Sequence, residues 1–238
     1  MWSNLSLLMA IIPSQKKQKI INLIKTRLPH GATLIILSLT GSRAWGYSNR
    51  HSDYDIVGLY VAKNYWDSVQ IYQDHCDINL YQFKNPLRDK RFYFFEDLSN
   101  PFYLHSKFDF EGFFKFCTID IVRYYDGEIL QRIRDFEINP SPRNALHAYQ
   151  SLMIPVHFLQ YHQFELNLFK INQSYKFQQL QKLKNAYLRK EEEVNKKEIC
   201  KDLKKLLNKY KQLCYVEYKG PSMAEGQKWF ERELDKFI

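Results

Sequence analysis

The chain has 238 residues, of which 45% are hydrophobic and 26% are charged, with 17 Phe and 17 Tyr. This composition excludes an intrinsically disordered chain and supplies the apolar surface for one large domain or two small ones. The 35 Lys and Arg outnumber the 26 Asp and Glu, and the resulting net charge of +9 favours polyanionic partners such as nucleic acid or nucleotides.

Membrane and secreted classes are also disfavoured. Apolar runs such as residues 34–39 are shorter than the roughly 20 residues needed to cross a bilayer. Residues 1–12 lack the charged region and the small-residue cleavage site of a secretion signal. The 4 cysteines form no C-x-x-C pair, which predicts neither a zinc site nor a disulfide framework. We therefore expect a cytoplasmic protein with free thiols and no membrane partner.

The N-terminal part of the chain predicts one helix followed by strands. Apolar residues at helical spacing predict an amphipathic helix over residues 15–29. Runs of apolar and β-branched residues predict strands at 33–39, 54–61 and 77–83. Residues 62–76 are polar and aromatic, and we expect a connection with one helical turn or an edge strand there.

The rest of the chain predicts helices almost throughout. Short helices are expected at residues 91–98 and 101–106. Longer helices are expected at residues 112–136, 142–169, 175–213 and 222–238. The change in pattern predicts a sheet-bearing domain over 1–110 and a helical C-terminal domain over 111–238. We therefore expect an α/β (α+β) fold, in which a mixed β-sheet flanked by helices precedes the helical domain.

Two short motifs can carry chemistry. Gly41-Ser42 directly follows the strand at 33–39, and a turn in this place leaves backbone N–H groups and a hydroxyl free to bind phosphate. Asp53 and Asp55 are two residues apart in an extended segment, so both carboxylates leave the strand on the same face. Each motif alone is usually a plain turn or a solvated pair, but the two in this order favour function.

A third carboxylate, Asp77, opens the last predicted strand. Antiparallel pairing of that strand with residues 54–61 is expected to bring Asp77 beside Asp53 and Asp55. Mg²⁺ and Mn²⁺ prefer oxygen ligands, so three carboxylates next to a phosphate-binding turn predict a divalent metal site. Such a site suits two-metal phosphoryl transfer from a nucleoside triphosphate.

These motifs resemble the signature of a known superfamily. Gly41-Ser42, Asp53-x-Asp55 and Asp77 are similar to the pattern of the DNA polymerase β-type nucleotidyltransferases. The string Gly-Ser-Arg-Ala-Trp-Gly-Tyr-(4)-Ser-Asp-Tyr-Asp is most similar to the RNA-ligase-associated group of predicted nucleotidyltransferases. The resemblance covers about residues 33–106, whereas the C-terminal half is similar only in being helical.

The resemblance implies a role for each residue of the motif. Gly41 and Ser42 would bind the β- and γ-phosphates of a nucleoside triphosphate. Asp53 and Asp55 would ligate both Mg²⁺ or Mn²⁺ ions, and Asp77 would ligate the catalytic ion near the acceptor hydroxyl. All three carboxylates are present, so the sequence gives no reason to expect an inactive enzyme.

The other residues near the turn have two interpretations each. Arg43, which we assign to nucleotide binding, either contacts the triphosphate or packs its stem under Trp45 with the guanidinium solvated. Trp45 and Tyr47 either stack on a nucleobase or, as is commoner, pack in the core.

A basic stretch lies in the predicted helical domain. Residues 176–211 hold 12 Lys and Arg against 5 Asp and Glu, with leucines interspersed. This pattern is typical of a solvated helix face with an apolar stripe, and it also suits contacts to an RNA backbone.

The leading hypothesis is an enzyme that transfers a nucleoside monophosphate (NMP) from a nucleoside triphosphate (NTP) to a hydroxyl acceptor and releases pyrophosphate. The positive charge favours an RNA 3′ end as acceptor over a protein or a small molecule. Two alternatives stay open. One is a non-catalytic nucleic-acid-binding module, and the other is an antitoxin-like regulator that binds a partner protein.

Overall fold

The computed structural model describes residues 12–63, 68–83, 92–116, 122–123, 125–214 and 222–237. Its centre is a five-stranded mixed sheet in the order β3-β4-β2-β1-β5. The strands are β1 (Thr33–Thr40), β2 (Tyr54–Val61), β3 (Val69–Gln73), β4 (Cys76–Gln82) and β5 (Pro101–Leu104). Helices flank this sheet, so the predicted fold class is confirmed. Residues 1–11 of the N-terminal segment considered above, and part of the helix predicted at 112–136, lie outside the described residues.

The direction of β4 differs from the prediction. Strand β2 pairs with β1 in the antiparallel sense but with β4 in the parallel sense. The cause is β3, the edge strand that was one of two alternatives for residues 62–76. It forms an antiparallel pair with β4, and the reversal at its end makes β4 run in the same direction as β2.

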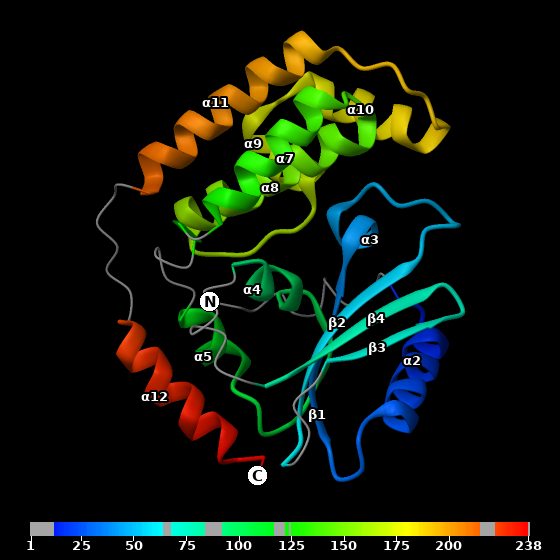
Figure 1. Cartoon of the computed structure of the whole chain (residues 1–238), viewed down its shortest axis with the longest axis vertical. Helices are drawn as coiled ribbons and strands as arrows, with labels where there is room; N and C mark the ends of the chain where they lie inside the picture. The colour runs from blue at the N-terminus through cyan, green and yellow to red at the C-terminus, as the bar shows by residue number, and fades with distance from the viewer. Residues whose placement is uncertain are drawn as a thin grey trace.

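Side-chain alternation divides the sheet into two faces. On one face, Ile56 and Ile78 pack with Ile20 and Ile24 of helix α2 (Ser14–Arg27). On the other face, strand residues such as Val57 join a cluster with the later helices. Figure 1 shows α2 and the helix group α7–α11 on different sides of the sheet.

The helices confirm several sequence expectations and correct others. They are α3 (Gly41–Trp45), α4 (Phe92–Leu98), α5 (Phe110–Lys115), α7 (Asp126–Ile138), α8 (Pro142–Tyr161), α9 (Leu168–Tyr175), α10 (Gln178–Arg189), α11 (Lys196–Cys214) and α12 (Met223–Leu234). The helix predicted at 142–169 ends early, because His162 adopts the left-handed conformation and α9 begins anew after its cap Asn167. The helix predicted at 175–213 is likewise two helices, separated at the left-handed Lys190.

The prediction of a helix at residues 101–106 is wrong. Residues Pro101–Leu104 form β5, which covers the outer edge of β1. An edge strand needs backbone hydrogen bonds on one side only, so Pro101 is tolerated there. The segment is held at its start, because the backbone N–H of Leu39 donates to the carbonyl oxygen of Asn100 at 3.1 Å.

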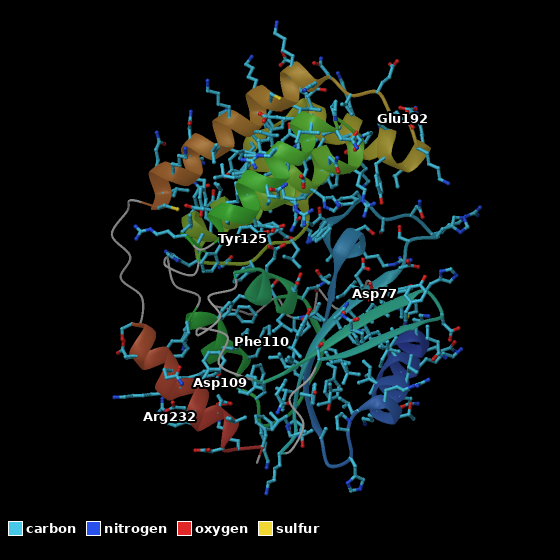
Figure 2. The ribbon with its side chains drawn as sticks, in the orientation of Figure 1. Asp77, Asp109, Phe110, Tyr125, Glu192 and Arg232 are labelled. Atoms are coloured by element: carbon cyan, nitrogen blue, oxygen red, sulfur yellow. The ribbon has the colours of Figure 1, made fainter. Side chains whose placement is uncertain are left out.

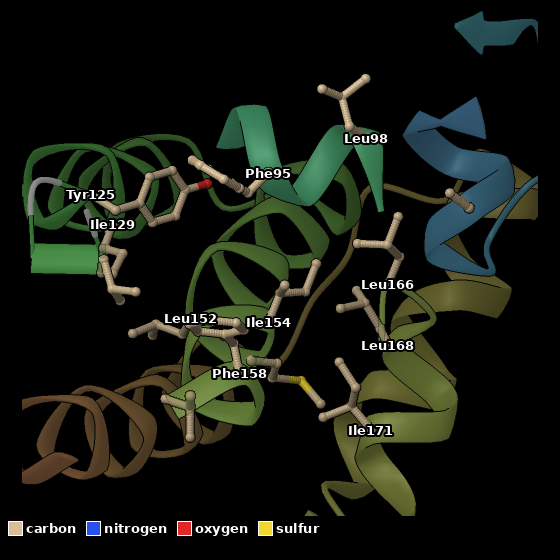
Figure 3. Packing of buried hydrophobic residues seen from close by; sticks show 14 of the residues in the cluster. Phe95, Leu98, Tyr125, Ile129, Leu152, Ile154, Phe158, Leu166, Leu168 and Ile171 are labelled. Carbon is tan, nitrogen blue, oxygen red and sulfur yellow. The ribbon is translucent and has the colours of Figure 1, made fainter. Parts of the chain in front are cut away.

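One hydrophobic cluster connects the sheet to the C-terminal helices. It includes Ile35 and Leu59 of the sheet together with buried residues of α4, α7, α8, α10 and α11. Figure 3 shows Phe95 of α4, Ile129 of α7 and Ile154 of α8 pointing into this common core. The boundary at residue 110 remains a prediction, whereas the core itself is continuous across it. Within the described ranges, no helix is long and apolar enough to cross a membrane.

Candidate functional site

The three predicted carboxylates lie at one end of two neighbouring strands. Asp55 of β2 and Asp77 of β4 are direct partners in the parallel register. Asp53 precedes β2 by one residue, and all three side chains line the same cleft. The structure therefore brings the carboxylates together by parallel pairing, where the sequence led us to expect antiparallel pairing. Figure 2 shows Asp77 on the sheet and Tyr125, which also lines the cleft, next to α7.

The predicted phosphate-binding turn lies against the second carboxylate. Strand β1 ends at Thr40, and Gly41 turns the chain into α3 with a φ of +65°. A Cβ atom at Gly41 would lie 1.8 Å from Oδ2 of Asp55, so both the backbone conformation and the contact require glycine. The backbone N–H of Ser42 donates to the Asp55 carboxylate. Gly41, Ser42 and Asp55 thus form one compact unit.

The electrostatics of this unit favour a bound cation. The pKa of Asp55 is raised from 3.8 to about 6, mainly by burial and then by the charges of Asp77 and Asp53, against smaller opposing effects of Arg43 and the Ser42 N–H. Carboxylate oxygens are the donors that Mg²⁺ and Mn²⁺ prefer, and a divalent ion would relieve this repulsion. The chemistry of the donor set therefore fits such ions, although among the described residues no group of three or more His, Cys, Asp or Glu is arranged so that it could hold a metal ion.

Two polar neighbours hold the outer carboxylates. The Nδ1 atom of His75 lies 3.1 Å from Oδ1 of Asp53, and Nδ2 of Asn79 donates to Oδ1 of Asp77 at 3.1 Å. His75 belongs to the two-residue turn between β3 and β4, where both Asp74 and His75 have positive φ. Neither neighbour was predicted: His75 reaches Asp53 only through the pairing of β4 with β2, whereas Asn79 shares a strand face with Asp77 and could have been found from their two-residue spacing.

The Arg43 side chain bonds to the backbone next to Asp53, and its contact with a triphosphate stays a prediction. Its Nε atom donates to the carbonyl oxygen of Asp53 at 3.0 Å, and its Nη2 atom donates to that of Ser52 at 2.5 Å. The guanidinium also lies 4.0 Å from the centre of the Tyr54 ring. Arg43 therefore ties α3 to the segment that carries Asp53, and it is absent from the lining of the cleft.

The carboxylates open into a cleft of about 720 Å³ between the sheet and the helix group α7–α11. A cleft of this volume is in the usual range for small-molecule sites. Several residues that the sequence analysis did not single out line it, namely Glu96, Asp97, Glu128, Arg132, Arg143, Gln150 and Tyr187. They come from four helices, α4, α7, α8 and α10, and share no short motif, so no local signal could have found them.

Trp45 and Tyr47 line the cleft and also pack into its walls. Tyr47 is only 1% exposed and meets the Tyr187 ring edge-on at 5.4 Å. The Trp45 ring meets the His147 ring edge-on at 5.8 Å. Neither the Trp45 Nε1 atom nor the Tyr47 hydroxyl has a hydrogen-bond partner among the described residues. Core packing, the commoner of the two interpretations, holds for Tyr47, a member of the large cluster.

A second acidic pair lies at the floor of the cleft. Glu96 is 1% exposed, and its Oε1 atom accepts a hydrogen bond from Nε2 of Gln150 at 2.6 Å. Its Oε2 atom has no partner in the described part of the chain. Asp97 accepts from the Thr40 hydroxyl at 2.6 Å. The pKa of Asp97 is raised to about 6, mainly by its burial. The pKa of Glu96 is held well above 4.5 by the burial of Glu96 and by the charge of Asp97.

A Glu96→Gln variant is expected to be more stable than the wild type at about pH 8, and this advantage is expected to be smaller at about pH 5. The folded wild type holds the Glu96 proton above the ordinary pKa of 4.5, so it loses stability as the pH rises, whereas Gln does not titrate. Urea unfolding at the two pH values measures the difference, with the exposed Glu192→Gln as the matched control. A stability difference that is equal at both pH values would contradict the assignment of a protonated Glu96.

The chain is similar to known proteins in part of its sequence. A search of curated proteins finds no match. Among solved structures, the chain is similar to a nucleotidyltransferase-like protein from Exiguobacterium sibiricum 255-15, at 13% identity and a TM-score of 0.25, over 94% of this chain and 73% of the other. Residues 15–81, which run from α2 to β4, match the RNA repair pathway DNA polymerase beta family. This segment thus carries the signature of that family, and the resemblance to polymerase β-type nucleotidyltransferases is confirmed.

Proposed function

We propose that the protein is a metal-dependent nucleotidyltransferase that transfers an NMP from an NTP to a hydroxyl acceptor. One observation carries the proposal: Asp55 and Asp77 are register partners at the strand ends, and Asp55 touches the Gly41-Ser42 turn. Asp53 completes the set in the same cleft. All of these residues lie within the segment that matches the polymerase β family.

The residues present suggest a division of roles. Asp53, Asp55 and Asp77 would hold two Mg²⁺ or Mn²⁺ ions, which when bound stabilise the developing negative charge and acidify the acceptor hydroxyl. The N–H groups of Gly41 and Ser42 would bind the β- and γ-phosphates. The acceptor oxygen then forms a bond to the α-phosphorus, while the bond to the β-phosphate breaks and pyrophosphate leaves.

The acceptor that we favour is an RNA 3′ end. Helix α11 has an inner face with Leu203 and Leu206 buried and an outer face with exposed lysines, which include Lys197, Lys201, Lys204 and Lys205. Such a face supplies phosphate contacts that do not depend on RNA sequence. In this proposal residues 1–110 perform the chemistry, and the helical part over 111–238 forms the opposite wall and selects the acceptor.

Label transfer tests the proposal. The full chain is incubated with each α-labelled NTP and either Mg²⁺ or Mn²⁺, and label is measured in total RNA and in total protein. We expect label in RNA from the wild type and none from an Asp53→Ala/Asp55→Ala control. Absence of metal-dependent NTP binding would overturn the proposal. Salt-dependent RNA binding that is indifferent to Asp53→Ala would then identify a non-catalytic nucleic-acid-binding module.

A further inference from the structure

Two arginines line the cleft from the wall opposite the carboxylates. Arg132 lies on α7 and Arg143 lies in the first turn of α8. Both line the cleft that contains Asp53, Asp55 and Asp77. Neither lies within residues 15–81, so the family match assigns no role to them.

Arg143 lies on the face of α8 that packs against α3, the short helix that follows the glycine-serine turn. His147 lies one helical turn after Arg143, and residues four apart share a helix face. The His147 ring meets the ring of Trp45 edge-on, with the centres 5.8 Å apart and the planes at 74°. Trp45 is the last residue of α3, the helix that begins at Gly41. Figure 1 shows α3 between the sheet and the helix group α7–α11.

The charges of both walls act on one buried group. The pKa of the Tyr47 hydroxyl is raised mainly by burial, with Arg143 and Arg132 lowering it and Asp55 raising it. The pKa of His147 is lowered to about 4, mainly by burial and then by the charges of the same two arginines. His147 is therefore neutral at pH 7, and the positive charge of this wall comes from the two guanidinium groups.

The two guanidinium groups differ in their acidic partners. The Nε atom of Arg132 donates to Oε1 of Glu128 at 2.7 Å, and both side chains are 40% exposed. Arg143 forms no ion pair with any carboxylate of the described residues. Arg143 therefore brings to the cleft a positive charge that no described carboxylate pairs with, and Arg132 brings one that is shared with Glu128. Their planar forks match phosphate oxygens and donate paired, charge-assisted hydrogen bonds to them.

We propose that Arg132 and Arg143 bind the phosphates of the NTP from the helical wall, opposite the carboxylates. The inference rests on the proposed function for the identity of the ligand, a polyphosphate. A nucleotide in this cleft has its charged groups between the three strand carboxylates and the helical wall that carries the two arginines and Glu128. The cleft of about 720 Å³ accommodates one nucleotide, and the arginines share it with the Gly41-Ser42 turn. This placement favours the triphosphate over the backbone phosphates of an RNA acceptor.

Binding of inorganic tripolyphosphate tests the inference without any chemical step. Calorimetry is performed on the full chain in the presence of a chelator, so that no metal ion contributes. We expect the wild type to bind, Arg132→Gln and Arg143→Gln each to bind about tenfold more weakly, and the double variant about 100-fold more weakly. Arg143→Lys, which keeps the charge without the fork, is expected to give an intermediate affinity.

The matched control is Arg134→Gln, because Arg134 is an exposed arginine on α7 that does not line the cleft. It is expected to bind as the wild type does, and thermal unfolding checks that every variant is folded. Wild-type affinity in a folded double variant would overturn the inference. Variants that keep tripolyphosphate affinity but raise the KM for RNA alone would show that the arginines bind the acceptor, and this result would also overturn the inference.

Failure of the proposed function gives a different pattern. If the protein transfers no label but tripolyphosphate binding depends on the two arginines, the phosphate site stands and the transferase does not. The Asp53→Ala/Asp55→Ala variant separates the two further, because without metal it is expected to bind tripolyphosphate at least as tightly as the wild type. Removing two negative charges from the opposite wall takes away repulsion of the anion.

Discussion

An Asp55→Asn variant is expected to lose nucleotidyl transfer by about 1,000-fold or more, yet to be at least as stable as the wild type. The loss of activity follows from the position of Asp55, which faces Asp77 in register and accepts from the Ser42 N–H. An amide is a neutral and weaker ligand for a divalent ion than a carboxylate. Label transfer at saturating NTP measures the activity.

The stability of Asp55→Asn follows from the raised pKa. Folding moves the pKa of Asp55 from 3.8 to about 6, so the folded state holds this proton more tightly than the unfolded state does. The metal-free wild type therefore loses stability as the pH rises through this window, and Asn removes that loss. We expect the advantage of the variant to be present at about pH 7 and absent at about pH 4, as measured by urea unfolding.

Mg²⁺ supplies the complementary control. A cation that binds only the folded state stabilises it, so Mg²⁺ is expected to raise the stability of the wild type more than that of Asp55→Asn. A variant that is less stable than the wild type at every pH, or that keeps full transfer activity, would contradict the assigned role of Asp55.

Gly41→Ala is expected to lower the free energy of unfolding by about 2–4 kcal/mol and transfer activity by about 100-fold or more. The φ of +65° is unfavourable for alanine, and the added Cβ would lie 1.8 Å from Oδ2 of Asp55. Relief of this clash requires a shift of the carboxylate or of the turn that binds phosphate. Urea unfolding and label transfer measure the two effects.

Gly127→Ala is the matched control for this prediction. Gly127 lies in α7, and a Cβ added there meets no atom within 4 Å. Alanine is expected to stabilise the protein by about 0.5–1 kcal/mol, because it reduces the backbone freedom of the unfolded chain. Equal stability and activity of Gly41→Ala and the wild type would show that Asp55 does not lie against the turn.

The sequence predicts the chemistry-bearing edge of the sheet well because its signals are local. Strand β2 has the predicted bounds, and Gly41 follows a strand directly as expected. The two-residue spacing of Asp53 and Asp55 fixes their common face without any tertiary information. Pairing direction is different, since it depends on the short strand β3, which appears in the sequence only as a polar and aromatic connection.

The helical wall could not be predicted in the same way. Arg132, Arg143 and Glu96 come from three helices, and only tertiary packing brings them to one cleft. Helix ends were also missed, because His162 and Lys190 stop helices in the left-handed conformation without the glycine that usually marks such a stop. The arginines and Glu96 can be assigned to the cleft only when the packing of α8 is known.

The continuous hydrophobic cluster has a consequence for how the protein unfolds. Strand residues such as Val57 and helix residues such as Leu152 belong to the same cluster, so the cleft side of the sheet shares its core with the helices, while the opposite side packs on α2. Loss of the helices would expose the apolar face of the sheet on which the carboxylates sit. The two walls therefore melt as one cooperative unit, and in a denaturant titration enzymatic activity and helical content disappear together.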